Sequence, residues 1–197
     1  MPPKAEVTRD KIGDAAFEFV REQGFETLTA RKIAQRLNCS TQPIYSVYGN
    51  MERLKLDAYD RALGFMREYM RSFSNAAYSP ALNLAIGLLQ FARNEKHLFR
   101  AVYLSGIRTY ELHKDRFIGE EITMASLRSS KRLSAISEEK LKTIFYKLTI
   151  YLIGLGTVMN TGTIDMSLEE ATELVRDQYE ALLLKENLSR PEGSDSI

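Results

Sequence analysis

Apolar residues recur three and four positions apart along most of the chain, which is the spacing of amphipathic helices. Strand-like alternation of apolar and polar residues is absent. The pattern therefore predicts an all-α protein of about nine helices. We expect them at about 8–23, 30–37, 41–48, 51–73, 80–94, 96–104, 107–130, 138–160 and 168–187, the seventh being the most weakly patterned.

Residues that favour helix ends support these boundaries. Thr29, Ser40 and Asn50 are expected to cap the second, third and fourth helices, because a short side-chain oxygen can accept an unpaired amide of the first turn. Ser167 with Glu170 has the spacing of a capping box for the last helix.

The second and third helices are short and joined by a turn of three to four residues, the spacing of a helix-turn-helix. There is no acidic residue between Glu26 and Glu52, whereas Arg31, Lys32 and Arg36 lie in that interval. The net charge of the whole chain is only +1, so nucleic-acid binding would have to depend on such a local patch. The spacing alone also fits a plain three-helix bundle with a solvated polar face.

The third helix carries side chains suited to contacting DNA. Gln42 can pair with adenine through two hydrogen bonds, and Thr41 can contact a thymine methyl. The hydroxyls of Tyr45 and Tyr48 suit phosphate oxygens. The segment therefore favours a DNA-reading helix.

A longer pattern covers about residues 8–57 and resembles the signature of the tetracycline-repressor (TetR) family. It consists of Phe25-Glu-Thr-Leu28-Thr29, Ile33-Ala34, Ser40, Ile44-Tyr45, Tyr48 and Glu52-x-Leu54. The resemblance implies a DNA-binding domain at 1–49, an effector-binding and dimerisation domain at 50–188, and a polar tail at 189–197. With the chemistry above, it assigns DNA contacts to Thr29, Arg31, Ser40, Thr41, Gln42, Pro43, Tyr45, Ser46, Tyr48, Arg53 and Lys55.

Three positions depart from the family pattern. Asn38 and Pro43 stand where the family often has glycine, and Met51 where it often has lysine. Asn tolerates a left-handed turn, but proline removes a backbone donor, and methionine loses a phosphate contact unless Arg53 or Lys55 replaces it. These departures leave open a second interpretation, a protein-interaction module of the same fold with weak or lost DNA binding.

The resemblance further implies a homodimer and a small-molecule effector. The effector pocket is expected among the following residues, although aromatic residues at helical spacing also suit a plain core: Met66, Tyr69, Phe91, Tyr103, Tyr110, His113, Phe117, Met124, Phe145 and Tyr146. The last two helices are expected to pair with the partner's copies, or alternatively to pack within the chain, through Leu148, Leu152, Leu155, Gly156, Met159, Val175, Tyr179 and Leu182. Gly154 and Gly156, inside an apolar helix, suggest a close backbone approach.

Composition narrows the function class. With 44% hydrophobic and 27% charged residues the chain has an ordinary soluble composition. Its one cysteine, Cys39, excludes an internal disulfide and, with two histidines, disfavours a structural zinc site. No nucleophile–base set or phosphate-binding loop is visible. The longest apolar run, 148–159, is too short to cross a bilayer. We therefore expect a cytoplasmic regulator without cofactor, metal or membrane partner that is not an enzyme.

Overall fold

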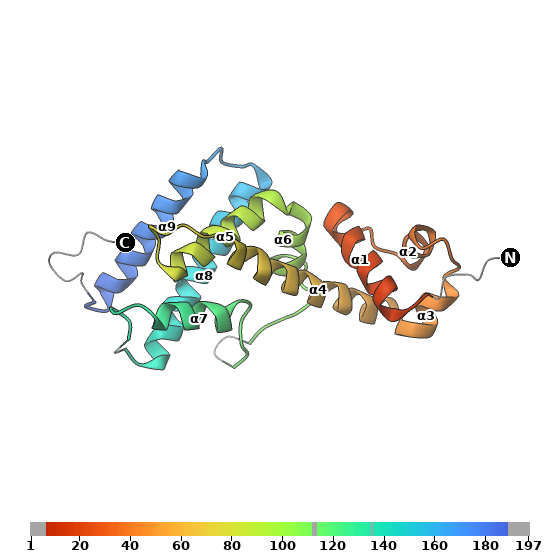
Figure 1. The fold of residues 1–197 in the computed structure, drawn as a ribbon, viewed down its shortest axis with the longest axis horizontal. Coiled ribbons are helices and arrows are strands. Elements are labelled where there is room, and N and C mark those ends of the chain that lie inside the picture. The colour runs from red at the N-terminus through yellow and green to blue at the C-terminus, as the bar shows by residue number, and fades with distance from the viewer. Residues whose placement is uncertain (1–6, 112–113, 135, 189–197) are drawn as a thin grey trace. The chain divides into compact units, whose positions relative to one another are not determined.

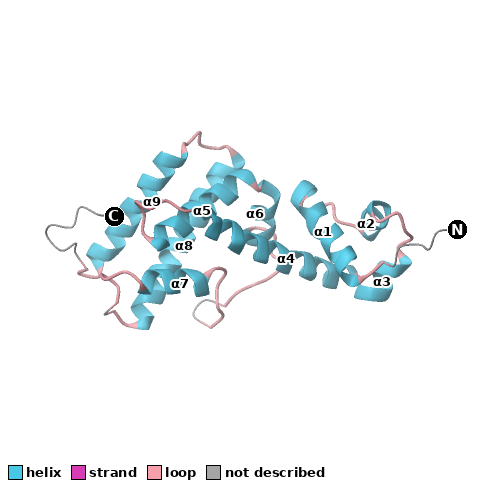
Figure 2. Ribbon diagram, in the orientation of Figure 1, coloured by secondary structure: helices cyan, strands magenta, loops and turns pink. Residues whose placement is uncertain are grey.

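The structure is a computed structural model that describes residues 7–111, 114–134 and 136–188. Within these ranges it contains nine α-helices and no strand, as Figure 2 shows, which confirms the predicted all-α class. They are α1 (Arg9–Gln23), α2 (Ala30–Arg36), α3 (Gln42–Tyr48), α4 (Met51–Ser72), α5 (Pro80–Asn94), α6 (Lys96–Tyr103), α7 (Glu120–Arg128), α8 (Glu138–Thr161) and α9 (Leu168–Lys185).

The expected seventh helix is wrong in length. The described residues between Gly106 and Gly119 are not helical, and α7 begins only at Glu120. Both glycines have positive φ, +67° and +78°, a conformation that interrupts a right-handed helix. Glu120, expected as one of a solvated pair, is buried at the start of α7.

The predicted caps are largely confirmed. Thr29 Oγ1 accepts the amide of Lys32 at 3.3 Å. Asn50 Oδ1 accepts the amide of Arg53 at 3.0 Å. The capping box of α9 is present in both directions. The prediction for Ser40 is wrong, because the residue preceding α3 is Thr41, whose backbone is already helical and whose side chain makes no cap bond.

The chain divides into two compact units. Unit 1 comprises Met1–Phe65 and Glu95–Thr109, so it contains α1, α2, α3, the first part of α4 and α6. In Figure 1, α1, α2 and α3 lie together at the first turns of α4. A buried hydrogen bond from the Tyr59 hydroxyl to the Val102 carbonyl, 3.3 Å, ties α4 to α6. The unit therefore extends past the boundary expected at residue 49.

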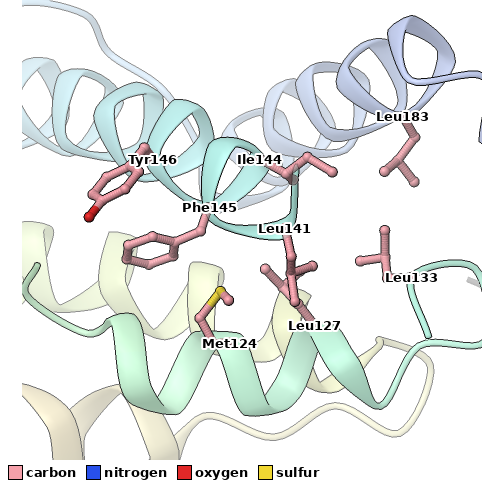
Figure 3. Packing of buried hydrophobic residues seen from close by; sticks show 8 residues of the cluster. All are labelled: Met124, Leu127, Leu133, Leu141, Ile144, Phe145, Tyr146 and Leu183. Carbon is pink, nitrogen blue, oxygen red and sulfur yellow. The ribbon is translucent and has the colours of Figure 1, made fainter. Parts of the chain in front are cut away.

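Unit 2 comprises Met66–Asn94 and Tyr110–Ile197, and in it α8 packs against α5, α7 and α9. Figure 3 shows part of its core, in which side chains of α7 and α8 face one another and Leu183 of α9 points toward Leu133. The helix α8 is the one described helix with the length and hydropathy of a membrane span, and 44% of that window is buried inside the protein. Its apolar character thus fits a core helix.

Candidate nucleic-acid interface

The helix α3 has an inner and an outer face. Ile44 and Tyr48, four residues apart, are buried, with 1% and 2% of their surfaces exposed. Gln42, Tyr45 and Ser46 are exposed. Unit 1 therefore presents a polar side of α3 to solvent while its apolar side forms part of the core.

Most of the residues that the sequence assigned to DNA contact lie on the surface of unit 1. The exposed ones are Thr29, Arg31, Ser40, Gln42, Tyr45, Ser46 and Arg53, and the partly exposed ones are Thr41, Pro43 and Lys55. Tyr45 is the most notable, because 47% of this large aromatic residue is exposed. An exposed tyrosine presents both an aromatic face and a hydroxyl to a ligand.

Tyr48 must be removed from this group. Its hydroxyl donates to Asp57 Oδ2 at 2.5 Å and lies 3.1 Å from the Arg9 carbonyl oxygen, with which it can also bond. Burial, followed by the hydrogen bond and the negative charge of Asp57, raises the pKa of this phenol well above its ordinary value. A neutral phenol whose proton is held inside the protein cannot contact a phosphate. The residue pattern did not reveal this, because the spacing of α3 fits either face at its last turn.

The charges around α3 are favourable for a polyanion. Within the described part of the chain, neither Arg31 nor Arg53 takes part in an ion pair. Other cations are partly engaged: Arg36 pairs with Glu22, and Lys55 lies 3.5 Å from Glu52. Arg31 and Arg53 are therefore the guanidinium groups best placed to neutralise phosphates.

Arg53 also bears on the departure at Met51. Its guanidinium lies beside Gly49, the residue that ends α3, where an added Cβ would be 3.6 Å from Arg53 Nη1. A cation therefore stands next to the end of α3 although the family's usual lysine is missing. This arrangement supports the expected replacement of that contact by Arg53.

The other two departures are compatible with the motif's geometry. Asn38 has φ of +50°, the left-handed conformation that an Asn tolerates in a turn. Pro43 lies in the first turn of α3, where its missing amide would have had no partner within the helix. The turn is closed by the Cys39 amide, which donates to the Ala34 carbonyl at 2.9 Å.

The residues expected to line an effector pocket do not all lie together. Tyr103 belongs to unit 1, where its ring packs on Phe99, and His113 lies outside the described residues. The others belong to unit 2. There, four rings follow one another with centroids 5.3–6.4 Å apart, namely Tyr110, Phe117, Tyr146 and Phe145. Glu120 joins this run, since its Oε2 lies 3.5 Å from the Tyr146 hydroxyl.

The expected dimer residues need correction. Six of them are buried inside the chain by the packing of α8 and α9 onto their own unit: Leu152, Leu155, Gly156, Met159, Val175 and Leu182. Leu148 and Tyr179 are partly buried against the core of unit 2. The opposite sides of the two helices instead expose Ile150 (62%), Leu174 (39%) and Leu184 (61%).

Gly154 lies on this exposed side of α8, and in this chain nothing would come within 4 Å of a Cβ added to it. The close approach expected at Gly154 is therefore not made within the chain. An intrachain approach of this kind occurs elsewhere, at Gly87.

The sequence matches no protein-family profile and no curated protein. The fold, however, matches solved structures. A TetR-like transcriptional regulator from Rhodococcus sp. RHA1 aligns with a TM-score of 0.58 and 18% identity over 88% of this chain and 96% of its own. A TetR-family member from Streptomyces coelicolor A3 aligns with a TM-score of 0.58 and 17% identity over 90% and 98%.

A second TetR regulator from Rhodococcus sp. RHA1 aligns with a TM-score of 0.50 and 13% identity over 92% of this chain and 98% of its own. The chain thus has the fold of TetR-like transcriptional regulators along nearly its whole length. The similarity expected from residues 8–57 is confirmed for the fold, and it extends through the helices of unit 2.

Proposed function

We propose that this protein is a transcriptional regulator that binds specific sequences of double-stranded DNA through α3. The observation that carries the proposal is the outer face of α3. It exposes Gln42, Tyr45 and Ser46, it has no acidic residue within the helix, and its opposite face is fixed in the core by Ile44. A helix of this size and polarity fits the major groove.

Each exposed residue has a role that its chemistry suits. Gln42 and Thr41 read base edges near the start of α3. Tyr45, Ser46, Ser40 and Thr29 donate to phosphates. The charges that screen the backbone come from Arg31, Arg53 and Lys55. Pro43 contributes ring contact but no amide bond.

The protein acts as a homodimer in this proposal. One helix of this length reads only a few base pairs, whereas two helices about 34 Å apart read successive major grooves of a two-fold site. The exposed side of α8 and α9, with Ile150, Gly154, Leu174 and Leu184, is the surface we assign to the second copy. Large apolar side chains at 39–62% exposure would be covered there.

A small amphipathic or aromatic effector binds unit 2 near the ring series Tyr110, Phe117, Tyr146 and Phe145 and releases the protein from DNA, so that it acts as a repressor in the cytoplasm. Release requires tighter binding to the state that does not bind DNA. A preference of about 100-fold corresponds to roughly 2.7 kcal/mol of coupling.

The direct test is selection of duplexes from a random library, followed by fluorescence anisotropy with the selected and a scrambled sequence across a salt series. We expect a two-fold-symmetric site, weakened by Gln42→Ala mainly for the selected sequence. Arg31→Ala should weaken both duplexes and lower the salt slope by about one. Arg71→Ala, which removes an exposed arginine of α4 outside unit 1, is the matched control and should change neither.

The same experiment decides the second candidate function. Pro43 and Met51 remove groups that often contact phosphate, and this favours a protein-interaction module that has kept the fold. Enrichment of no sequence, with equal weak binding to every duplex, would overturn the proposed function and favour that module.

A further inference from the structure

Three helices of unit 1 meet at a cluster of polar side chains behind α3, which we call the Tyr48 cluster: Tyr48, Asp57, Arg61, Asp10 and Asp14. Asp57 Oδ2 accepts the Tyr48 hydroxyl at 2.5 Å and lies 3.4 Å from Arg61 Nε. Arg61 extends further, with Nη1 2.5 Å from Asp14 and Nη2 3.3 Å from Asp10. The last residue of α3 is thereby connected through α4 to the first turns of α1.

The cluster is built at close quarters. A Cβ added to Gly13 of α1 would lie 2.5 Å from Asp57 Oδ2 and 2.6 Å from Arg61 Nε. The Arg9 guanidinium lies over the Tyr48 ring, 5.0 Å from its centroid. The tyrosine is therefore held at both its ring and its hydroxyl, and the absence of a side chain at position 13 leaves room for its partners.

The direction of α3 depends on very few buried groups. Ile44 and Tyr48 are the buried residues of this seven-residue helix. Apolar contact is non-directional, so the packing of Ile44 alone permits the helix to rotate about that point. A hydrogen bond is directional, and the oxygen that Tyr48 meets is itself fixed by Arg61.

We propose that Tyr48, acting through Asp57 and Arg61, is a positioning residue that sets the orientation of α3 and so the selectivity of DNA binding, without touching DNA. The inference rests on the proposed DNA-binding function. Its reason is geometric: base-edge hydrogen bonds tolerate only small displacements, about 0.5 Å or 10–20°, whereas phosphate attraction tolerates more. Loss of the tie should therefore affect recognition of sequence before it affects general affinity.

The test is Tyr48→Phe, which removes the hydroxyl and keeps the ring. We expect affinity for the selected duplex to fall about tenfold, with affinity for a scrambled duplex unchanged. Tyr59→Phe is the matched control, because it removes another buried hydroxyl from the same unit, whose bond goes to Val102 of α6 and not to α3. Thermal stability is measured for both variants, and Tyr59→Phe should retain the wild-type ratio of the two affinities.

A double substitution checks the route. If Tyr48 acts through Asp57, Tyr48→Phe combined with Asp57→Asn should lose no more selectivity than Asp57→Asn alone. The inference would be overturned by wild-type selectivity in Tyr48→Phe, by an equal loss in Tyr59→Phe, or by additive losses in the double variant. A wild-type chain that selects no sequence would instead overturn the proposed function, and this inference with it.

Discussion

Arg21 of α1 and Glu95, at the start of α6, form a two-pronged ion pair, with Nε 2.9 Å from Oε2 and Nη2 2.6 Å from Oε1. The arginine also lies over the ring of Phe65, 4.8 Å from its centroid. One side chain thus joins α1, α4 and α6 within unit 1. This pair helps to explain why α6 belongs to the unit that carries α3, although more than forty residues of chain separate it from α3.

We expect Glu95→Gln to lower the free energy of unfolding by about 1 kcal/mol, measured by urea denaturation. A two-pronged, charge-assisted contact is stronger than an ordinary surface ion pair, but solvent around the half-exposed Arg21 reduces its value. Glu95 makes no side-chain cap bond to α6, so the substitution tests the pair and not a helix cap.

The matched control is Glu68→Gln, which breaks the exposed pair of Glu68 with Arg71, 2.7 Å apart. It should change the free energy of unfolding by no more than about 0.5 kcal/mol. Equal effects of the two substitutions would contradict the special role of the Arg21–Glu95 pair.

Two threonines at helix starts should differ in their effect on stability. Thr29→Ala should cost about 1 kcal/mol, because Thr29 Oγ1 accepts the Lys32 amide and that amide would lose its partner. Thr41→Ala should cost a few tenths at most, since the Thr41 side chain makes no cap bond with α3. Chemical denaturation of both variants checks this, and a larger loss for Thr41→Ala would show that the cap assignment is wrong.

Much of the fold follows from local signals that the sequence carries openly. Ser167 and Glu170 stand at the spacing of a capping box, and Asn38 is one of the few residues that tolerate positive φ. Such signals depend on neighbours within one turn of chain. That is why the helix starts and the helix-turn-helix could be predicted, and why the fold comparison agrees with them.

Features that depend on distant residues could not be read in the same way. The hydroxyl of Tyr48 is withdrawn from solvent by Asp57, nine positions away on another helix. The apolar residues of α8 surround much of the helix, so their periodicity does not distinguish the side that packs on its own chain from the side around Ile150. The correct side required the positions of α5, α7 and α9.

Gly87 of α5 lies against the backbone of α4, and a Cβ there would be 2.5 Å from the Met70 carbonyl oxygen. Because backbone atoms cannot turn aside as a side chain can, Gly87→Ala should destabilise the protein by about 1–3 kcal/mol. Gly64→Ala is the matched helical control. Nothing would lie within 4 Å of its Cβ, and alanine should stabilise α4 by up to about 1 kcal/mol. Thermal melts of the two variants should shift in opposite directions, and a shared direction would contradict the close crossing.

The exposed side of α8 and α9 should decide the oligomeric state. Ile150 and Leu184 are 62% and 61% exposed in the single chain, so a charge at either place costs the isolated chain little. In a homodimer that covers them, Ile150→Glu or Leu184→Glu would bury an unpaired carboxylate, and we expect the dimer dissociation constant to rise at least about thirtyfold. Analytical ultracentrifugation measures this, with Leu104→Glu, 50% exposed in unit 1, as the matched control that should remain dimeric. A dimer that persists in Ile150→Glu and Leu184→Glu but dissociates in Leu104→Glu would move the interface to unit 1, whereas a monomeric wild type would leave the two-fold operator without its physical basis.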